Sequence, residues 1–400
     1  MKYSLNLILG ILVFLFIFNS VKSIYLSKKN FSQKINRVAT VRARSNITPF
    51  IPKAQPKITI TLNKMESIKY YVNPQSGDDN NDGLTEKSAL KNIQKAIYLA
   101  MPGDNIILLP GIYLQDIVTS RDGGLGKPIT IEGSRDAIIK GGGSAHVVEV
   151  NHDNIKLKGF TIDGHFTSDL NKKSYRDKLV YVTGQIPGKG VKNFSMFDMD
   201  IKNAGGECVR LRYLVTQSEI ANNKISSCGV ADFVFKDGGK NGEGIYVGTA
   251  PEQRNDKKNP TNDIDQSNSN WIHHNDFNTK GNECVDIKEG SSENIVEYNN
   301  CTGQIDPESG GLDSRGNNNI FRLNTIFDNL GAGIRLGGDT ENDGIGNQIY
   351  ENVIINNKAG GIKFQRNFQG KVCGNTMNNN EKGNSVGEFA KDYKPDIACN

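Results

Sequence analysis

The residues with the clearest chemical potential lie on short repeated segments in the second half of the chain. Placed in register, these segments give two outward columns, one made of Arg210, Tyr246, Asp286, Asp313, Arg335 and Lys363, the other of Arg212, Gly248, Lys288, Arg315, Gly337 and Gln365. Side chains two apart on a strand face the same side, so both columns belong to one face. Cations and carboxylates are interleaved on this face, and the glycines flanking Lys288 and Arg315 are expected to leave a groove.

This strip of charges suits β-elimination from a polymer of uronic acids. The reaction removes the proton beside the carboxylate and expels the neighbouring glycosidic oxygen, so it needs a base, a neutralised carboxylate and a donor to that oxygen. We assign Lys288 as the base, because a neighbouring cation such as Arg315 lowers the pKa of a lysine. Arg315 is the acid, either as proton donor or as the group that polarises the leaving oxygen. The residues expected to bind the substrate are Arg335, Arg212, Tyr246 and Asp313.

Acidic side chains recur at one place on the same segments. Glu243 and Glu283 begin successive segments, and Asp286 follows three residues after Glu283. Carboxylate oxygens are the ligands that hard divalent cations prefer. The pattern therefore predicts a calcium site formed by Glu243, Glu283 and Asp286.

Two other interpretations fit the same strip. Asp286, Lys288, Asp313 and Arg315 could form a surface ladder of ion pairs, which contributes little energy, on a non-catalytic glycan-binding or cell-surface protein. Alternatively, the carboxylates of Asp286 and Asp313 could be the acid and base of a glycoside hydrolase, which needs two such groups about 5 to 9.5 Å apart.

A repeat of about 25 residues determines how these side chains are positioned. Each unit has an apolar-alternating segment that ends on an asparagine, and these asparagines lie at Asn275, Asn299, Asn324, Asn352 and Asn375, with gaps of 24, 25, 28 and 23 residues. A second strand follows in each unit, and the connections are too short for crossover helices. The sequence predicts an all-β, right-handed parallel β-helix solenoid in which the asparagines form a ladder. A short amphipathic helix over 90–100 is expected to cap its N-terminal end.

Two stretches resemble known families. Residues 70–113, from Tyr70 through Pro110-Gly-Ile-Tyr113, are similar to the start of many secreted β-helix proteins of the pectate-lyase-like group. Within 281–340, Gly281-Asn-Glu283-Cys-Val-Asp-Ile-Lys288 and Leu312-Asp-Ser-Arg315 resemble polysaccharide lyase family six, the chondroitinase B and alginate lyase family. The resemblance implies Lys288 as base and Arg315 as acid. The chain differs from the family pattern at the first metal-ligand glutamate, where it has Gly281, and after the catalytic arginine, where it has Gly316.

The ends of the chain differ from its body. Residues 1–23 have a basic start and a 14-residue apolar block, which is typical of a signal peptide and predicts a secreted protein; the alternative is an uncleaved N-terminal membrane anchor. Residues 24–69 are predicted to be a basic linker or pro-segment, and 70–400 a single β-helix domain without a stable membrane span after cleavage of the signal. Residues 1–69 hold 12 of the 48 basic and 1 of the 44 acidic residues, so the remainder has a net charge of −7. This argues against nucleic-acid binding.

The six cysteines predict disulfides in an exported chain. Cys208 and Cys284 occupy the same strand position and, with Cys228 and Cys301, are expected to staple the coils; the pairing is left open. We expect a monomer whose partner is an acidic polysaccharide. The long polar insertion 251–269 is expected to be a mobile loop.

Overall fold

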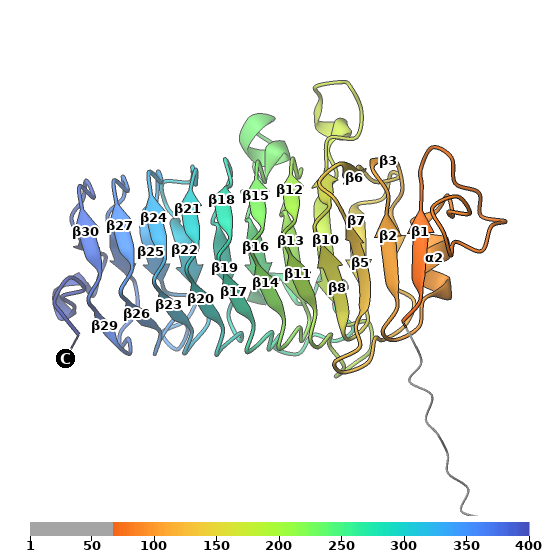
Figure 1. The fold of residues 1–400 in the computed structure, drawn as a ribbon. Coiled ribbons are helices and arrows are strands. Elements are labelled where there is room, and N and C mark those ends of the chain that lie inside the picture. Colours follow the sequence, from red (N-terminus) through yellow and green to blue (C-terminus); the bar gives the residue numbers. More distant parts are fainter. Residues whose placement is uncertain (1–66, 400) are drawn as a thin grey trace, which may run out of the picture. The chain divides into compact units, whose positions relative to one another are not determined.

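Short parallel strands stack into three long sheets in the computed structural model, which describes residues 67–399 (Figure 1). Sheet A contains β1 (Lys69–Val72), β2 (Asn105–Leu108), β5 (Ile129–Gly133), β8 (Ile155–Lys158), β11 (Ser195–Phe197), β14 (Glu219–Ala221), β17 (Trp271–His273), β20 (Ile295–Glu297), β23 (Ile320–Arg322), β26 (Gln348–Tyr350) and β29 (Val372–Cys373). Sheet B contains β3 (Gly111–Tyr113), β6 (Ala137–Ile139), β9 (Thr161–Asp163), β12 (Asp200–Lys202), β15 (Lys224–Ser226), β18 (Asp276–Asn278), β21 (Asn300–Thr302), β24 (Thr325–Phe327), β27 (Val353–Ile355) and β30 (Thr376–Asn378).

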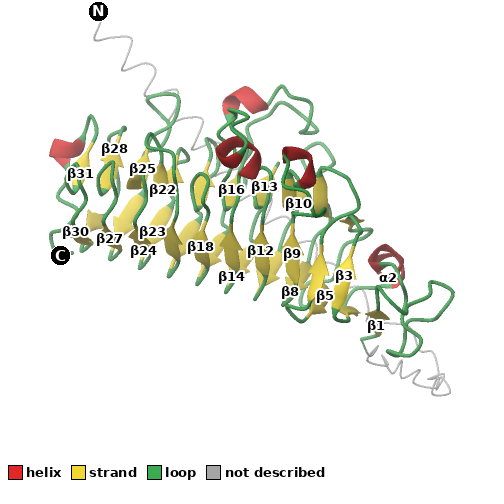
Figure 2. Cartoon of the chain, turned by 90° about the horizontal axis from the view of Figure 1, so that it is seen from above, coloured by secondary structure: helices red, strands yellow, loops and turns green. Residues whose placement is uncertain are grey.

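Sheet C carries the charged columns. Its strands are β4 (Ile117–Val118), β7 (His146–Val150), β10 (Lys178–Thr183), β13 (Val209–Arg212), β16 (Ile245–Val247), β19 (Val285–Ile287), β22 (Gly310–Ser314), β25 (Ala332–Leu336), β28 (Ile362–Phe364) and β31 (Ser385–Val386). The helices are short: α2 (Ile93–Leu99), the 3-10 turns η1 (Lys172–Ser174), η3 (Pro251–Gln253) and η4 (Ala390–Asp392), and the π turn η2 (Val230–Val234). Figure 2 shows short helical turns gathered beside β10, β13 and β16 of sheet C.

The predicted right-handed parallel β-helix is confirmed, with one addition. Successive coils pair in parallel in every sheet, and each regular coil contributes one strand to each. The sequence indicated the strands of sheets A and C. It did not indicate those of sheet B, such as β18, which begins directly after Asn275, the asparagine that ends the repeated segment in the sequence pattern.

The predicted asparagine ladder is also present. Asn275 donates from Nδ2 to Oδ1 of Asn299 at 3.0 Å and to the carbonyl of Ile220 at 2.9 Å, and Asn299 repeats the pattern with Asn324 one coil further. The residue before each of these asparagines has a positive φ, as at His274 with 54°. This left-handed residue turns the chain from sheet A into sheet B, and the ladder satisfies the backbone groups that the turn leaves unpaired.

Apolar columns fill the interior as expected. Val209, Ile245, Val285, Leu312, Ile334 and Ile362 are paired in register on sheet C and are fully buried. The cysteines form the disulfides Cys208–Cys228, Cys284–Cys301 and Cys373–Cys399, so the first two confirm the expected staples within coils.

Helix α2 covers the N-terminal end of the solenoid, within the range predicted for the capping helix. It buries Ile93, Ala96 and Ile97 and contacts β1, β2 and β4. Over residues 67–399, no helix has both the length and the apolar content needed to cross a membrane. The predicted signal peptide and most of the basic linker lie outside the described residues.

Candidate functional site

The outward column of sheet C has the register expected from the sequence. Arg210, Tyr246, Asp286, Asp313, Arg335 and Lys363 are paired on six successive strands. Lys288 and Arg315 directly follow β19 and β22, whose last residues are paired with each other. Period-two strands that stack in register therefore bring both predicted catalytic residues to one place on one sheet.

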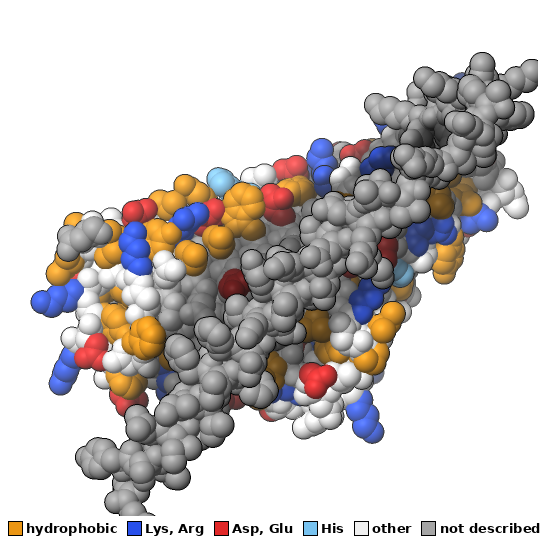
Figure 3. Space-filling model, turned by 90° about the horizontal axis from the view of Figure 1, so that it is seen from below, with side chains coloured by type: hydrophobic (Ala, Val, Ile, Leu, Met, Phe, Trp, Pro, Cys, Tyr) orange, Lys and Arg blue, Asp and Glu red, His pale blue; other side chains and the backbone are white. Residues whose placement is uncertain are grey.

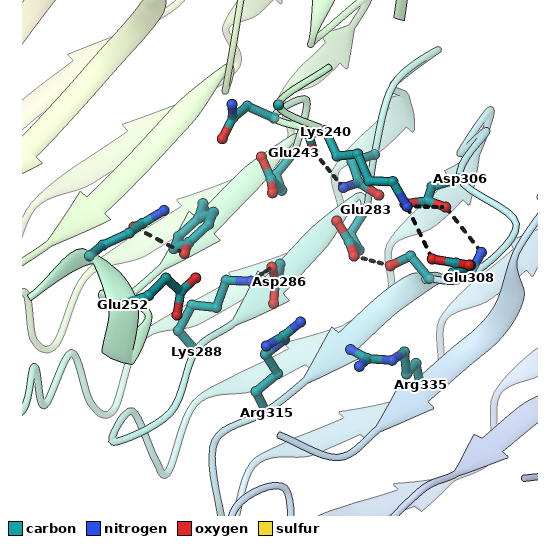
Figure 4. Close-up of a pocket in the computed structure, with 16 residues that line it drawn as sticks. Lys240, Glu243, Glu252, Glu283, Asp286, Lys288, Asp306, Glu308, Arg315 and Arg335 are labelled. Carbon is teal, nitrogen blue, oxygen red and sulfur yellow. Dashed lines mark hydrogen bonds and ion pairs between the residues drawn. The ribbon is translucent and has the colours of Figure 1, made fainter. Parts of the chain in front are cut away.

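Loops turn this face into a pocket with a cavity of about 290 Å³. One wall is the segment around Lys240, after η2; the others are η3, at Glu252, and the segment that holds Asp306 and Glu308 (Figure 4). The expected origin of the groove is wrong, because the glycines leave no space. A Cβ at Gly248 would lie 2.4 Å from the Ser291 hydroxyl, and Gly248 has a φ of +89°, so this glycine serves a tight backbone turn.

Three buried carboxylates converge on the floor of the pocket. One oxygen each from Glu243, Glu283 and Asp286 lies within 4.8 Å of the other two, and Figure 4 shows the three side chains around one space. Glu243 accepts a hydrogen bond from the amide of Gly242, and Glu283 accepts one from the hydroxyl of Ser309. The Oε2 of Glu283 and the Oδ1 of Asp286 have no hydrogen-bond partner.

Burial and the charges of neighbouring carboxylates raise the pKa values of two members of this cluster, Glu243 and Glu283. Burial, with the charges of Glu207 and Asp286, raises the pKa of Glu243 from 4.5 to about 7. The pKa of Glu283 is raised well above its ordinary value by burial and by Asp286 and Glu243. Three converging carboxylates, two of which have an oxygen without a hydrogen-bond partner, fit the ligand chemistry of a hard divalent cation such as calcium. The residues predicted as metal ligands are thus brought together.

Lys288 lies against this cluster. Its Nζ is 2.6 Å from Oδ2 of Asp286 and 4.7 Å from the centre of the Tyr246 ring. Burial lowers the pKa of Lys288, but Asp286 and Tyr246 outweigh burial and Arg315, so the pKa is raised above its ordinary value. The expectation that Arg315 sets the direction of this shift is therefore wrong, because a carboxylate in direct contact outweighs a cation on the next coil.

The two arginines of the pocket are held by acids. Nη1 of Arg315 lies 3.0 Å from Asp339 and 3.3 Å from Glu289, and Nη1 of Arg335 lies 2.5 Å from Asp313. Burial lowers the pKa of Arg315, but the surrounding carboxylates raise it by more than burial lowers it. The pKa is therefore raised overall, and the guanidinium is held in its charged form. Both side chains line the pocket and present fixed positive charge to it.

The residues predicted to bind substrate divide into two groups. Arg335 and Tyr246 line the pocket, although the Tyr246 ring lies against the guanidinium of Arg210, 3.5 Å from its centre, and is 2% exposed. Asp313 is fully buried and holds Arg335. Arg212 is not among the lining residues. Asp313 and Arg212 are therefore buried and offer the substrate no free contact in this conformation.

Arg212 instead holds the insertion in place. Its guanidinium donates to Asn259 at 2.5 Å, to Asp256 at 2.7 Å and to the carbonyl of Gln253 at 3.2 Å. Asp265 of the same insertion accepts from the backbone amides of Tyr213 and Leu214. Contrary to the expectation of a mobile loop, these hydrogen bonds and the ion pair between Arg212 and Asp256 tie the insertion to β13 and the residues that follow it.

Several lining residues escaped the sequence analysis. Lys240 bridges Asp306 at 3.0 Å and Glu308 at 3.2 Å across the mouth of the pocket. All three lie in loops of irregular length, where the period of the repeat gives no register. Glu207 does not line the pocket, but it occupies the strand position of Glu243 one coil earlier and of Glu283 two coils earlier, as the aligned segments already indicate.

Comparison with solved structures identifies the fold. An alginate lyase from Paenibacillus sp. str. FPU-7 has a TM-score of 0.57 at 18% identity, over 73% of this chain and 96% of its own. The fold is that of the pectate-lyase-like right-handed parallel β-helix. Pectate lyase Pel9A is similar with a TM-score of 0.49 at 14% identity, over 73% of this chain and 71% of its own. A DFA-IIIase from Arthrobacter chlorophenolicus A6 in complex with GF2 has a TM-score of 0.47 at 13% identity, over 77% of this chain and 87% of its own. No family model and no curated protein matches the sequence.

Proposed function

We propose that this protein is a polysaccharide lyase that cleaves an acidic, uronate-containing polysaccharide by β-elimination. The observation that carries the proposal is the convergence of a three-carboxylate cluster, Lys288, Arg315 and Arg335 in one pocket. Elimination beside a carboxylate needs a positive charge next to that carboxylate, a base for the neighbouring proton and a group that polarises the leaving oxygen. All three must lie around one sugar ring of the substrate. The pocket offers a candidate for each. The three disulfides support action outside the cell, and we expect a monomer.

Each side chain has a distinct part in this proposal. Arg335, held by Asp313, binds and neutralises the uronate carboxylate. Lys288, in its uncharged form, takes the proton from C5, and the electrons of that C–H bond form the double bond between C4 and C5. The C4–O bond breaks with its electron pair on oxygen, and Arg315 hydrogen-bonds that oxygen. The raised pKa of Arg315 favours a polarising role, with the proton supplied through solvent.

The carboxylate cluster is the proposed cofactor site. Glu243, Glu283 and Asp286 would hold the ion through their converging oxygens. When bound there, calcium supplies positive charge that acts on the substrate carboxylate and against the ammonium form of Lys288. The buried, unpartnered oxygens of Glu283 and Asp286 support this assignment.

The test is an ultraviolet assay for unsaturated uronate ends. The purified full chain is incubated with alginate, pectate and dermatan sulfate, with calcium or with EDTA. We expect absorbance to rise on one polymer, and to be lost in Lys288→Arg, which keeps the positive charge beside Asp286 but cannot act as a base near neutrality. Lys224→Arg, at an exposed lysine on sheet B, is the matched control and should leave the rate unchanged.

A glycoside hydrolase is the second candidate, and one observation favours it. Glu243 has a pKa of about 7 and can hold a proton at neutral pH beside the carboxylates of Glu283 and Asp286, as a general acid must. The pair considered from the sequence, Asp286 and Asp313, is unsuitable because Asp313 is buried beneath Arg335. New reducing ends without ultraviolet absorbance, lost in Glu243→Gln, would establish this function. Retention on a polymer without cleavage would establish a glycan-binding protein.

A further inference from the structure

A second group of side chains with binding chemistry lies on the outer face of sheet A. Trp271, the single tryptophan of the chain, is on β17 and is 40% exposed, and Tyr298 on the next coil is 48% exposed. The exposed part of each ring is apolar area that burial against a ligand would stabilise by about 25 cal/mol per Å². In Figure 3 hydrophobic side chains lie among charged ones, with a histidine, along one long edge of the molecule.

The indole of Trp271 is fixed in one orientation. Its ring stacks on the imidazole of His273, with centres 3.8 Å apart and planes 27° apart, and its Nε1 donates to Oε1 of Glu297 at 2.7 Å. The other oxygen of Glu297 accepts from Arg322 at 2.5 Å. One face of the indole is therefore covered by His273, and the exposed area belongs to the remainder of the ring, which the stack and the hydrogen bond hold in this orientation.

Neighbouring side chains extend this platform. Tyr298 stacks on His274, with centres 4.9 Å apart and planes 17° apart. Ile295 and Ile320, half-buried, continue the column of Trp271 along the next two coils. The result is an aromatic and aliphatic surface that follows the axis of the solenoid on sheet A, whereas the pocket lies on sheet C.

The carboxylates around the platform already have hydrogen-bond or ion-pair partners. Glu297 is held by Trp271 and Arg322, and Glu219 lies 3.2 Å from Nε2 of His273. An ionic ligand would have to break these pairs. A ligand with an apolar face and hydroxyls at its edge would not, because its C–H groups meet the negative face of the indole and its hydroxyls reach the polar rim.

We infer that Trp271 and Tyr298 form a separate binding platform for the pyranose rings of a polysaccharide chain, by stacking and not by charge. This goes beyond the proposed function and does not depend on it, since the platform shares no residue with the pocket. The platform would keep a polysaccharide bound to the protein whether the pocket on sheet C is empty or occupied by substrate. Its ligand is recognised by the sugar ring, so neutral and acidic chains should both bind.

The single tryptophan makes the test direct. Emission of Trp271 is titrated in the full-chain Lys288→Arg variant with alginate and with hydroxyethyl cellulose, so that no cleavage intervenes. We expect a saturable change with both polymers that persists at high salt. No change with either polymer, or a change with alginate that high salt abolishes, would overturn the inference. A ligand confined to the pocket should leave this emission unaltered. A lyase without the platform would therefore be active as the wild type but would show no change of Trp271 emission in the Lys288→Arg variant.

Affinity electrophoresis in gels that contain the same polymers provides the second readout. Trp271→Ala should weaken retardation about 2- to 10-fold, the fold-change expected for one aromatic stack. Tyr98→Ala, an aromatic side chain of α2 that is 59% exposed, is the control and should not change it. Equal retardation of Trp271→Ala and wild type would refute the platform. Should Trp271→Ala fail to fold, as judged by circular dichroism, Tyr298→Ala replaces it and is expected to weaken retardation in the same direction.

Discussion

Glu207 and Glu243 occupy the same strand position on neighbouring coils, yet their surroundings shift their pKa values in opposite directions. Glu207 is held by Lys178 at 2.9 Å and Arg210 at 2.7 Å, and these cations outweigh burial and lower its pKa from 4.5 to about 2. Glu243 has no cation paired to it among the described residues, and its pKa rises to about 7. We predict that the same substitution, glutamate to glutamine, changes stability with opposite signs at these two positions.

The magnitude follows from the two shifts. A shift of one pKa unit corresponds to about 1.4 kcal/mol, so each shift of roughly 2.5 units corresponds to about 3 kcal/mol. The stabilisation from Glu207 is fully present above pH 4.5 and is lost as the pH falls through 2. Glu243 binds more protons in the folded than in the unfolded protein between pH 4.5 and 7, so its destabilisation grows across that window and is complete above 7. At pH 8 without divalent cations, Glu207→Gln should cost about 3 kcal/mol and Glu243→Gln should gain about 3 kcal/mol.

Urea unfolding in EDTA, followed by circular dichroism, measures both effects. The gain from Glu243→Gln should mostly vanish at pH 5, where the folded carboxyl is already protonated, while most of the cost of Glu207→Gln should remain. Glu86→Gln, at an exposed position, serves as the control and should change little at either pH. Equal signs for the two variants at pH 8, or a gain from Glu243→Gln that is the same at pH 5, would refute the electrostatic reasoning.

Three further outcomes can be checked in the same preparations. Calcium at about 100 times its Kd should stabilise the wild type by about 3 kcal/mol at pH 8. It should stabilise the Glu243→Gln variant by less, so an equal rise in the urea midpoints of both proteins would contradict the ligand assignment. Asn299→Ala should cost about 3 kcal/mol, because it removes two donated ladder hydrogen bonds and leaves buried partners unpaired, whereas exposed Asn300→Ala should cost less than about 0.5 kcal/mol. Glu289→Gln should lower kcat about tenfold with little change in KM, since buried Glu289 orients Arg315; a KM effect alone would point to substrate binding.

The period of the repeat made most of the fold predictable. Stacked coils share one register, so aligning the segments was enough to place Arg210, Tyr246, Asp286, Asp313 and Arg335 in one column. The asparagine ladder and the apolar columns follow from the same register. The strands of sheet B from β15 onward were missed because each begins directly after an asparagine that the sequence pattern treats as the end of a segment.

The site was predictable only as far as it lies on strands. Glu243, Glu283, Asp286, Lys288 and Arg315 are on the strands of sheet C or within two residues of them, and the structure brings them together. The predicted direction of the pKa shift of Lys288 was wrong because the prediction left out the contact with Asp286. Asp286 and Lys288 are two residues apart along one strand, so their side chains face the same side. The walls of the pocket could not be placed, since loop conformation depends on local contacts and not on the repeat.

The way a solenoid stacks its coils explains why the site is where it is. A repeat that begins three successive segments with glutamate places Glu207, Glu243 and Glu283 about 4.8 Å apart from coil to coil. Buried like charges at that spacing must each be neutralised or protonated. The cations on β10 and β13 neutralise Glu207, whereas Glu243 and Glu283 have no paired cation within residues 67–399. The two acids left over face the pocket beside Lys288 with raised pKa values, and we expect a divalent cation to take the place of their protons. A chain with Lys178 and Arg210 removed should therefore extend the acidic cluster by one coil, whereas a cation placed beside Glu243 should abolish it.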